Sequence, residues 1–486
     1  MTAFGESQRQ RNLDRPAFVS MVIVLATGSV WLTALAGAQH PAASAGPRTA
    51  RAIPDHLAMT PPMGWNSWDS YGFTIDEKEF KANADWMAEH LKPFGWQYVV
   101  VDEGWFLRNP ESGGKPAWQF TLDETSRYVP ASNRYPSAAN SAGFKPLADY
   151  VHSLGLKFGL HIVRGISRQA VAKNTPIADS PYHAADAADE SDTCAWNSDN
   201  YGVKDSAAGQ AYYDSVARLY AGWGLDFIKA DCISSRPYKE SEIRMISAAL
   251  KKTGRPIVLS LSPGPTSLAN AASVRQYAQM WRISDDFWDY WDHTKDQDQN
   301  WTQTLHGQFA AAVGWAPHIE PGHWPDADML PIGYIGPHPG LGPARQTRFT
   351  HDEQRTLITL WSIIRSPLII GGNLTQNDEW TTALLTNPEV IAVDQHSTGN
   401  RPLIVANSTV IWSARPEDGK GYYLAVFNRG DSPQTTELAW NEVGLVAGRA
   451  YKVRDLWEHT DLGAQSSLKL TLQPHACVLY RLTPEK

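Results

Sequence analysis

The chain has 486 residues, of which 42% are hydrophobic and 19% charged, so it can bury a large core and is not globally disordered. This length fits two domains, or a single domain only if that domain is a large barrel. A formal net charge of −8 without any basic run argues against a nucleic-acid partner.

The first segment of the chain has the pattern of an export signal. Arginines precede an apolar stretch over residues 18–35, and the small residues 36–38 follow it. This order predicts a signal peptide over residues 1–38, so we expect a secreted or periplasmic protein that is free of the membrane after cleavage. A membrane anchor is the alternative, although Gly28 interrupts the apolar stretch. Residues 39–54 are rich in Pro, Ala and Arg, which is typical of a linker.

Between residues 55 and 393, short apolar strands alternate with helical patterns, which predicts βα units and a parallel sheet. The expected strands lie near residues 62–66, 98–101, 157–163, 225–228, 256–261, 278–283, 326–328 and 366–372. Polar or acidic residues follow nearly every one of them. A (β/α)8 barrel builds its active site on the loops after its strands, so we expect an α/β fold of this kind. A doubly wound sheet is the alternative, but no Gly-rich fingerprint follows the first strand.

The last part of the chain, residues 394–486, has a different pattern. Short apolar strands with turn residues between them are expected at 409–412, 422–427, 437–440, 450–455, 467–472 and 476–481. This spacing predicts a C-terminal antiparallel β-sandwich domain.

Two aspartates at strand ends are the candidate catalytic pair. Asp231 ends one buried strand, with Lys229 two residues earlier on the same face, and Asp286 follows another strand two units later. Opposed carboxylates at a barrel mouth suit glycoside hydrolysis, in which one attacks the sugar and the other protonates the leaving oxygen. The alternatives are a structural ion pair between Lys229 and Asp231, and helix capping by Asp286 or its neighbour Asp285.

The cysteines and histidines give weaker signals. In an exported protein, one disulfide among Cys194, Cys232 and Cys477 is plausible, and the first two are the favoured pair because both lie on loops at the expected active face. Three reduced, buried thiols are the alternative. The histidines are scattered, so we expect no metal site and no cofactor.

A series of short motifs occurs along the chain: Met63–Trp68 (MGWNSW), Val101–Trp105 (VDEGW), Gly155–Gly159 (GLKFG), Ile228–Asp231 (IKAD), Trp281–Asp286 (WRISDD) and Trp324–Leu330 (WPDADML). Together, and in this order, they resemble glycoside hydrolase family 27, the melibiase family of α-galactosidases and their relatives. The resemblance extends from about residue 54 to the end of the chain. It implies a barrel with a C-terminal antiparallel β-domain, and hydrolysis with retention through a covalent glycosyl-enzyme intermediate. It also implies site roles: Asp231 as nucleophile, Asp286 as acid/base, and Trp68, Asp102, Lys229 and Arg282 as residues that hold the terminal sugar.

Several positions depart from the galactosidase pattern of that family. The departures are Glu103 in place of a second aspartate at the sugar's O4 and O6, His161 in place of a tyrosine, Ala230 in place of an aromatic residue, and Ser262 in place of a glutamate that contacts the 2-hydroxyl. We count Glu103, His161 and Ser262 as substrate-binding residues, and we expect them to shift the specificity. The alternative is that the loop Asp192–Asn197, with Trp196, supplies the missing contacts and that the enzyme is an ordinary α-galactosidase. The family's loop disulfide implies a bridge from Cys194 to Cys232, although Cys232 is one position nearer to the nucleophile than is usual.

The expected function is therefore that of an α-galactosidase-like hydrolase acting on the terminal sugar of an oligo- or polysaccharide. Specificity for α-N-acetylgalactosaminides, β-L-arabinopyranosides or isomaltose units is the alternative within the family. A carbohydrate-binding protein without catalysis is a further alternative, against which the presence of both aspartates argues. A metal-dependent hydrolase is another, against which the lack of clustered histidines argues.

Overall fold

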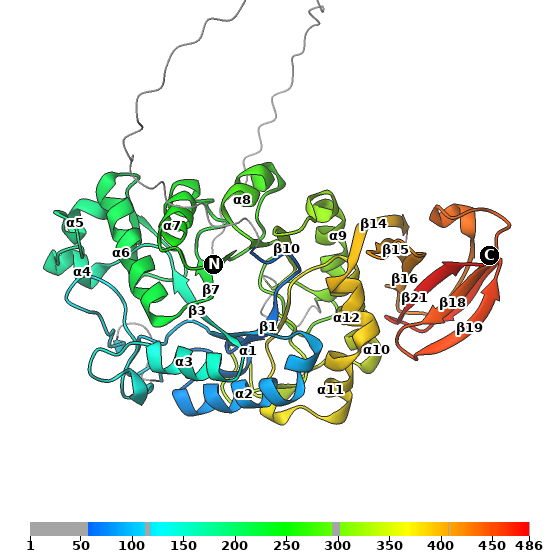
Figure 1. Ribbon diagram of the computed structural model, residues 1–486, viewed down its shortest axis with the longest axis horizontal. Coiled ribbons are helices and arrows are strands. Elements are labelled where there is room, and N and C mark those ends of the chain that lie inside the picture. Colours follow the sequence, from blue (N-terminus) through cyan, green and yellow to red (C-terminus); the bar gives the residue numbers. More distant parts are fainter. Residues whose placement is uncertain (1–56, 112–116, 294–301, 407, 486) are drawn as a thin grey trace, which may run out of the picture. The chain divides into compact units, whose positions relative to one another are not determined.

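The computed structural model describes residues 57–111, 117–293, 302–406 and 408–485, which belong to one compact unit, Ile53–Lys486 (Figure 1). The expected signal peptide, residues 1–38, and the expected linker, residues 39–54, lie outside the described residues.

The centre of the fold is a curled sheet of eight parallel strands. They are β1 (Met63–Asn66), β2 (Tyr98–Val101), β3 (Lys157–Val163), β7 (Phe227–Asp231), β8 (Val258–Leu261), β9 (Met280–Arg282), β10 (Trp324–Asp326) and β13 (Leu368–Ile370). Their order is β10-β9-β8-β7-β3-β2-β1-β13. Just beyond β10, Leu330 forms a parallel bridge with Ile370 of β13. Because β10 and β13 are the two edge strands, this bridge links the edges of the sheet. The predicted barrel is confirmed, and each strand overlaps the segment predicted for it. Strand β7 begins and ends later than the predicted residues 225–228, and β10 begins and ends earlier than the predicted residues 326–328.

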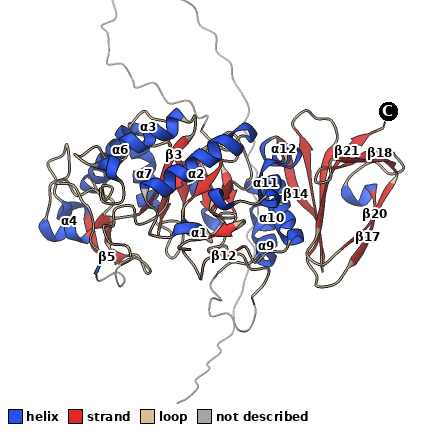
Figure 2. Cartoon of the chain, turned by 90° about the horizontal axis from the view of Figure 1, so that it is seen from below, coloured by secondary structure: helices blue, strands red, loops and turns tan. Residues whose placement is uncertain are grey.

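Helices connect the strands (Figure 2). They are α1 (Trp68–Tyr71), α2 (Glu77–His90), α3 (Lys145–Ser153), α4 (Arg168–Lys173), α5 (Ala184–Ala187), α6 (Ala207–Trp223), α7 (Glu240–Lys252), α8 (Ala271–Tyr277), α9 (Leu305–Trp315), α10 (His351–Ile363), α11 (Glu379–Thr386) and α12 (Pro388–Gln395). In α2, an Asp76–Glu79 capping box satisfies the first turn, and Phe80, Ala84 and Met87 recur at helical spacing and are buried. Among the described residues, no helix combines the length and the apolar character needed to cross a membrane.

The long insertion after β3 forms a small sheet of its own. Strands β4 (Ile166–Ser167), β5 (Ala188–Thr193) and β6 (Asn200–Val203) pair antiparallel in the order β4-β6-β5. A disulfide joins Cys194, at the end of β5, to Cys232, directly after β7, with 6.0 Å between their Cα atoms. The favoured cysteine pairing is confirmed, and Cys477 is a free thiol. A second short hairpin, β11 (Tyr334–Ile335) and β12 (Arg345–Gln346), follows β10.

The C-terminal domain consists of two antiparallel sheets. One has the order β14-β15-β16-β21-β18-β19 and the other pairs β17 with β20. The bounds are β14 (Ser397–Ala406), β15 (Thr409–Pro416), β16 (Tyr422–Asn428), β17 (Gln434–Ala439), β18 (Tyr451–Asp455), β19 (Thr460–Gln465), β20 (Ser467–Leu472) and β21 (Cys477–Pro484). Leu438 and Leu468 of the smaller sheet share one apolar cluster with Leu424 and Leu482 of the larger, as in a sandwich. Strand β19 was not predicted because nearly all its side chains are exposed, which leaves no apolar alternation.

Candidate active site

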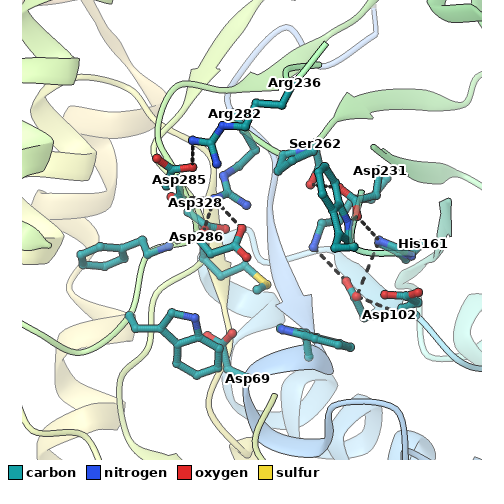
Figure 3. A pocket seen from close by; sticks show the side chains of 18 residues that line it. Asp69, Asp102, His161, Asp231, Arg236, Ser262, Arg282, Asp285, Asp286 and Asp328 are labelled. Atoms are coloured by element: carbon teal, nitrogen blue, oxygen red, sulfur yellow. Dashed lines mark hydrogen bonds and ion pairs between the residues drawn. The ribbon is translucent and has the colours of Figure 1, made fainter. Parts of the chain in front are cut away.

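A pocket of about 350 Å³ opens at the carboxyl ends of the barrel strands (Figure 3). Every residue predicted for the site lines it: Trp68, Asp102, Glu103, His161, Lys229, Asp231, Ser262, Arg282 and Asp286. The lining also includes residues that the sequence analysis did not assign to the site: Asp69, Trp196, Arg236, Pro263, Asp285, Phe287, Trp288, Asp328 and Met329. The sequence could have indicated two of these residues: Asp285 adjoins Asp286, and Asp328 lies within the WPDADML motif.

Two donors from different loops fix the carboxylate of Asp231. The Ser262 hydroxyl donates to Oδ1 at 2.9 Å, and the indole N–H of Trp196 donates to Oδ2 at 3.2 Å. Nε2 of His161 lies 3.8 Å from Oδ2, beyond hydrogen-bond distance. The carboxylate therefore points into the pocket in a defined orientation.

Lys229 pairs with a different residue from the one that the sequence indicated. Within the described ranges, its ammonium forms an ion pair with Asp102, with 3.0 Å from Nζ to Oδ2, and none with Asp231. Its long side chain reaches past β3 to the loop after β2, a neighbourhood that only the strand order reveals. The alternative interpretation, a structural ion pair between Lys229 and Asp231, is therefore wrong.

Asp102 is buried and fully bonded. Oδ2 also accepts from the Asn66 amide at 2.7 Å, and Oδ1 accepts from the backbone N–H of Glu103 at 2.8 Å. Burial alone would raise the pKa of Asp102, but His161, Lys229 and these donors hold that pKa well below its usual value. The Asp102 carboxylate is therefore ionised at neutral pH.

His161 lies between the carboxylates of Asp102 and Asp231. Its Nε2 is 3.9 Å from Asp102 Oδ1, and its backbone carbonyl accepts from the Trp105 indole at 2.8 Å. Burial lowers the pKa of His161, so the ring is neutral at neutral pH. Nδ1 is buried and has no hydrogen-bond partner in the described part of the chain.

Arg282, at the end of β9, organises the other side of the pocket. Its guanidinium contacts Asp328 Oδ2 at 2.6 Å and Asp286 Oδ1 at 3.2 Å, and it donates to the carbonyl of Asp285 at 2.8 Å. Burial raises the pKa of Asp328 to about 6, against the opposing effect of the Arg282 guanidinium. Asp286 is thereby tethered at the pocket wall while its carboxylate stays partly exposed.

The insertion after β3 holds Glu103 in place. The amide N–H of Asn197 donates to Glu103 Oε1 at 2.7 Å, and the Asn197 carbonyl oxygen accepts from the backbone N–H of Asp199 at 2.9 Å. The second bond fixes which side of the amide faces Glu103. The same loop contacts Glu103 through Asn197 and Asp231 through Trp196. The Cys194–Cys232 disulfide ties this loop to the residue that follows Asp231.

Trp68 forms another wall of the pocket. Its ring packs edge-on against Phe73, with 4.9 Å between the ring centroids, and lies against the backbone of Gly340. A Cβ at Gly340 would lie 2.5 Å from the indole nitrogen, so only glycine lets the ring occupy this position.

In the described ranges, no group of three or more His, Cys, Asp or Glu side chains is arranged to hold a metal ion. The chemistry available in the pocket is that of ionisable and hydrogen-bonding side chains, with two aspartates on separate loops facing one space.

Paired carboxylates at the carboxyl ends of barrel strands, walled by tryptophans, define a glycoside hydrolase site. The family model described as alpha galactosidase A matches residues 60–187 and 193–396, and that of the alpha galactosidase C-terminal beta sandwich domain matches residues 406–482. The chain therefore belongs to the α-galactosidase family of glycosidases, glycoside hydrolase family 27, as the motifs predicted.

Known relatives within this family differ in their named activities. An alpha-galactosidase of Coffea arabica is 30% identical over 435 residues, which are 88% of this chain and 95% of the relative. The crystal structure of a GH27 β-L-arabinopyranosidase from Geobacillus stearothermophilus is 47% identical, with a TM-score of 0.82, and the match covers 88% of this chain and 97% of that chain. A structure from Bacillus halodurans C-125, proposed to be an alpha-N-acetylgalactosaminidase, is 41% identical, with a TM-score of 0.76 and coverage of 88% and 98%.

Proposed function

We propose that this protein is an exported, retaining glycosidase that releases terminal β-L-arabinopyranosyl units. The observation that carries the proposal is the position of Glu103, whose carboxylate the Asn197 amide holds in the pocket at 2.7 Å. Membership of the family establishes a glycosidase.

The proposed mechanism uses Asp231 and Asp286. Asp231 attacks the anomeric carbon and forms a glycosyl-aspartate ester, while Asp286 transfers its proton to the departing glycosidic oxygen. Asp286, now ionised, then takes a proton from water, whose oxygen attacks the anomeric carbon and releases Asp231. Two inversions give net retention. The Ser262 and Trp196 donors support this role for Asp231 because they orient its carboxylate before the sugar arrives.

The choice of sugar depends on the space beside carbon 5. β-L-Arabinopyranose has the ring configuration of α-D-galactopyranose but lacks the hydroxymethyl group at that carbon. Glu103 stands where the family's galactosidases carry an aspartate at the O4 and O6 edge, and it is one methylene longer. A fixed, longer carboxylate at that edge takes up room that a hydroxymethyl group needs, and it leaves room for a pentopyranose.

The identities to known relatives support this choice. The β-L-arabinopyranosidase of Geobacillus stearothermophilus is 47% identical to this chain, whereas the alpha-galactosidase of Coffea arabica is 30% identical. The intact family motifs favour α-galactoside hydrolysis as the second candidate, because the two sugars share every ring hydroxyl orientation.

The experiment that tests the sugar assignment compares kcat/KM on nitrophenyl β-L-arabinopyranoside, α-D-galactoside, α-N-acetylgalactosaminide and isomaltoside. We expect the arabinopyranoside to be preferred, and Glu103→Asp to shift the preference toward the galactoside by about tenfold or more. A dominant preference for the α-galactoside in the natural enzyme, unchanged by Glu103→Asp, contradicts the proposal and leaves an α-galactosidase.

Export rests on the sequence of residues 1–38, and the Cys194–Cys232 disulfide supports an oxidising compartment. The test is expression of the full chain and of a chain that starts at residue 39 in a bacterial host. Activity in the culture medium or periplasm only with the full chain supports export, and an uncleaved full-length product in the membrane fraction argues for an anchor.

A further inference from the structure

The pocket has a buried inner part and an exposed outer rim. The side chains of Asp102, His161 and Arg282 are each 3% exposed. By contrast, the side chains of Asp286 and Arg236 are 43% and 56% exposed. A terminal sugar bound in the inner part, as in the proposed function, places whatever is attached to it at the rim.

The rim contains an ion pair between two loops. Arg236, from the loop after β7, binds the carboxylate of Asp285, from the loop after β9, and both side chains line the pocket beside Asp286 (Figure 3). In the sheet these two strands are separated by β8, so the pair bridges the edge of the pocket above the loop of Ser262. The side chains of Arg236 and Asp285 are 56% and 31% exposed, so the pair contributes little to stability and its remaining polar atoms are accessible to a ligand.

Trp196 provides an aromatic surface at the same opening. Trp196 is 39% exposed, while its indole N–H donates to Asp231 Oδ2 at 3.2 Å. The ring therefore stands at the entrance with one edge on the carboxylate. Aromatic faces of this kind stack on the C–H faces of sugars.

We propose that Trp196 and the Arg236–Asp285 pair form the binding site for the leaving sugar unit. The inference rests on the acid/base role of Asp286 in the proposed function. A proton donor must touch the glycosidic oxygen, so the atoms beyond that oxygen lie next to Asp286, at the rim. A guanidinium and a carboxylate side by side match neighbouring sugar hydroxyls, which accept from one and donate to the other. The substrate class is then a glycoside whose leaving group is itself a sugar, as in an oligosaccharide or a polysaccharide side chain.

The test compares two substrates that carry the same terminal sugar: a disaccharide and the methyl glycoside. Both need a proton from the acid, but only the disaccharide fills the rim. We expect Arg236→Met and Asp285→Asn each to lower the ratio of kcat/KM on the disaccharide to kcat/KM on the methyl glycoside by about tenfold, as expected when a charge-assisted hydrogen bond is lost. Arg244→Met, a change on α7 that breaks an exposed ion pair with Asp205, is the matched control and leaves the ratio unchanged.

A ratio that stays at its natural value in both rim variants overturns the proposal, whether or not the two activities fall together. Equal losses on both substrates indicate that the pair acts on Asp286 and not on the leaving sugar. The measurement is made in both the arabinose and the galactose series, so a wrong assignment of the terminal sugar does not affect its outcome.

Discussion

The hydroxyl of Ser262 donates a hydrogen bond to Asp231 Oδ1 at 2.9 Å. This contact joins the loop after β8 to the carboxylate that ends β7. In the family's galactosidases a glutamate stands at the position of Ser262 and contacts the sugar's 2-hydroxyl. Here the shorter side chain is bonded to the proposed nucleophile, so it orients that carboxylate and leaves the 2-hydroxyl without a charged partner at this position.

Ser262→Ala tests this orienting role. We expect kcat/KM to fall about tenfold or more, because a hydrogen bond to a charged carboxylate contributes on the order of 1.5–3 kcal/mol. Ser247→Ala is the matched control, since Ser247 is also buried and its hydroxyl donates to the Tyr277 carbonyl at 2.8 Å, away from the pocket. Steady-state kinetics and chemical unfolding of both variants separate catalysis from stability. Unchanged kinetics in Ser262→Ala shows that the bond has no orienting role.

Much of the fold and the site could be predicted because the relevant signals are local. Asp231 and Asp286 follow apolar strands, and polar residues after parallel strands meet at one face. The partner of Lys229 could not be predicted, because it depends on which strands are neighbours after the barrel curls. The role of Arg236 could not be predicted for the same reason. Its contact with Asp285 joins the loops after β7 and β9, which are separated by β8 in the sheet.

The catalytic pair is tested by Asp231→Ala and Asp286→Ala. Each change should remove most activity and leave folding intact, because both side chains face the pocket and not the apolar core. Azide should restore part of the activity of Asp231→Ala, with a glycosyl azide as product, since the small anion replaces the missing nucleophile. Activity close to that of the natural enzyme in either variant excludes the assignment.

The proposed attack by Asp231 also predicts the stereochemical course of the reaction. Direct attack by Asp231 leaves no room for an intervening water, so the two carboxyl groups should lie roughly 5–6 Å apart. Proton NMR during early hydrolysis should therefore show the sugar released with the anomeric configuration of the substrate. Initial release of the opposite anomer would mean that water attacks directly and that Asp231 is a general base.

The ion pair of Asp102 and Lys229 makes a prediction about stability. Asp102→Asn leaves a buried ammonium without its counter-ion, and we expect a loss of about 3 kcal/mol in the free energy of unfolding at pH 7. Replacing both residues, with Asp102→Asn and Lys229→Met, should recover part of this loss because the unpaired charge is removed. Urea unfolding measures both, and a double variant no more stable than Asp102→Asn contradicts the explanation.

The ion pair of Asp102 and Lys229 also determines how the free energy of unfolding depends on pH. The pKa of Asp102 is lower in the folded protein than its unfolded value of about 3.9, so its contribution is fully present above that value and is lost as the pH falls through the folded pKa. The difference in unfolding free energy between the natural enzyme and Asp102→Asn should stay constant from pH 7 to about pH 5. It should shrink only below about pH 4. A difference that already shrinks near pH 6 would assign the effect to His161.

Asn197 controls specificity through Glu103, because its amide holds the glutamate at 2.7 Å and is itself oriented by the backbone N–H of Asp199. Asn197→Ala removes this hydrogen bond, so the Glu103 carboxylate is held less firmly at the carbon 5 side of the sugar. We expect the ratio of kcat/KM for β-L-arabinopyranoside to that for α-D-galactoside to fall by about fivefold or more, since a mobile side chain excludes the hydroxymethyl group less well. Asn400→Ala is the matched control: Asn400 is buried and donates to the Ile363 carbonyl at 2.7 Å, outside the pocket. If Asn197→Ala lowers activity on both substrates equally, the change has disturbed the loop as a whole. In that case the selectivity of Glu103 does not depend on Asn197.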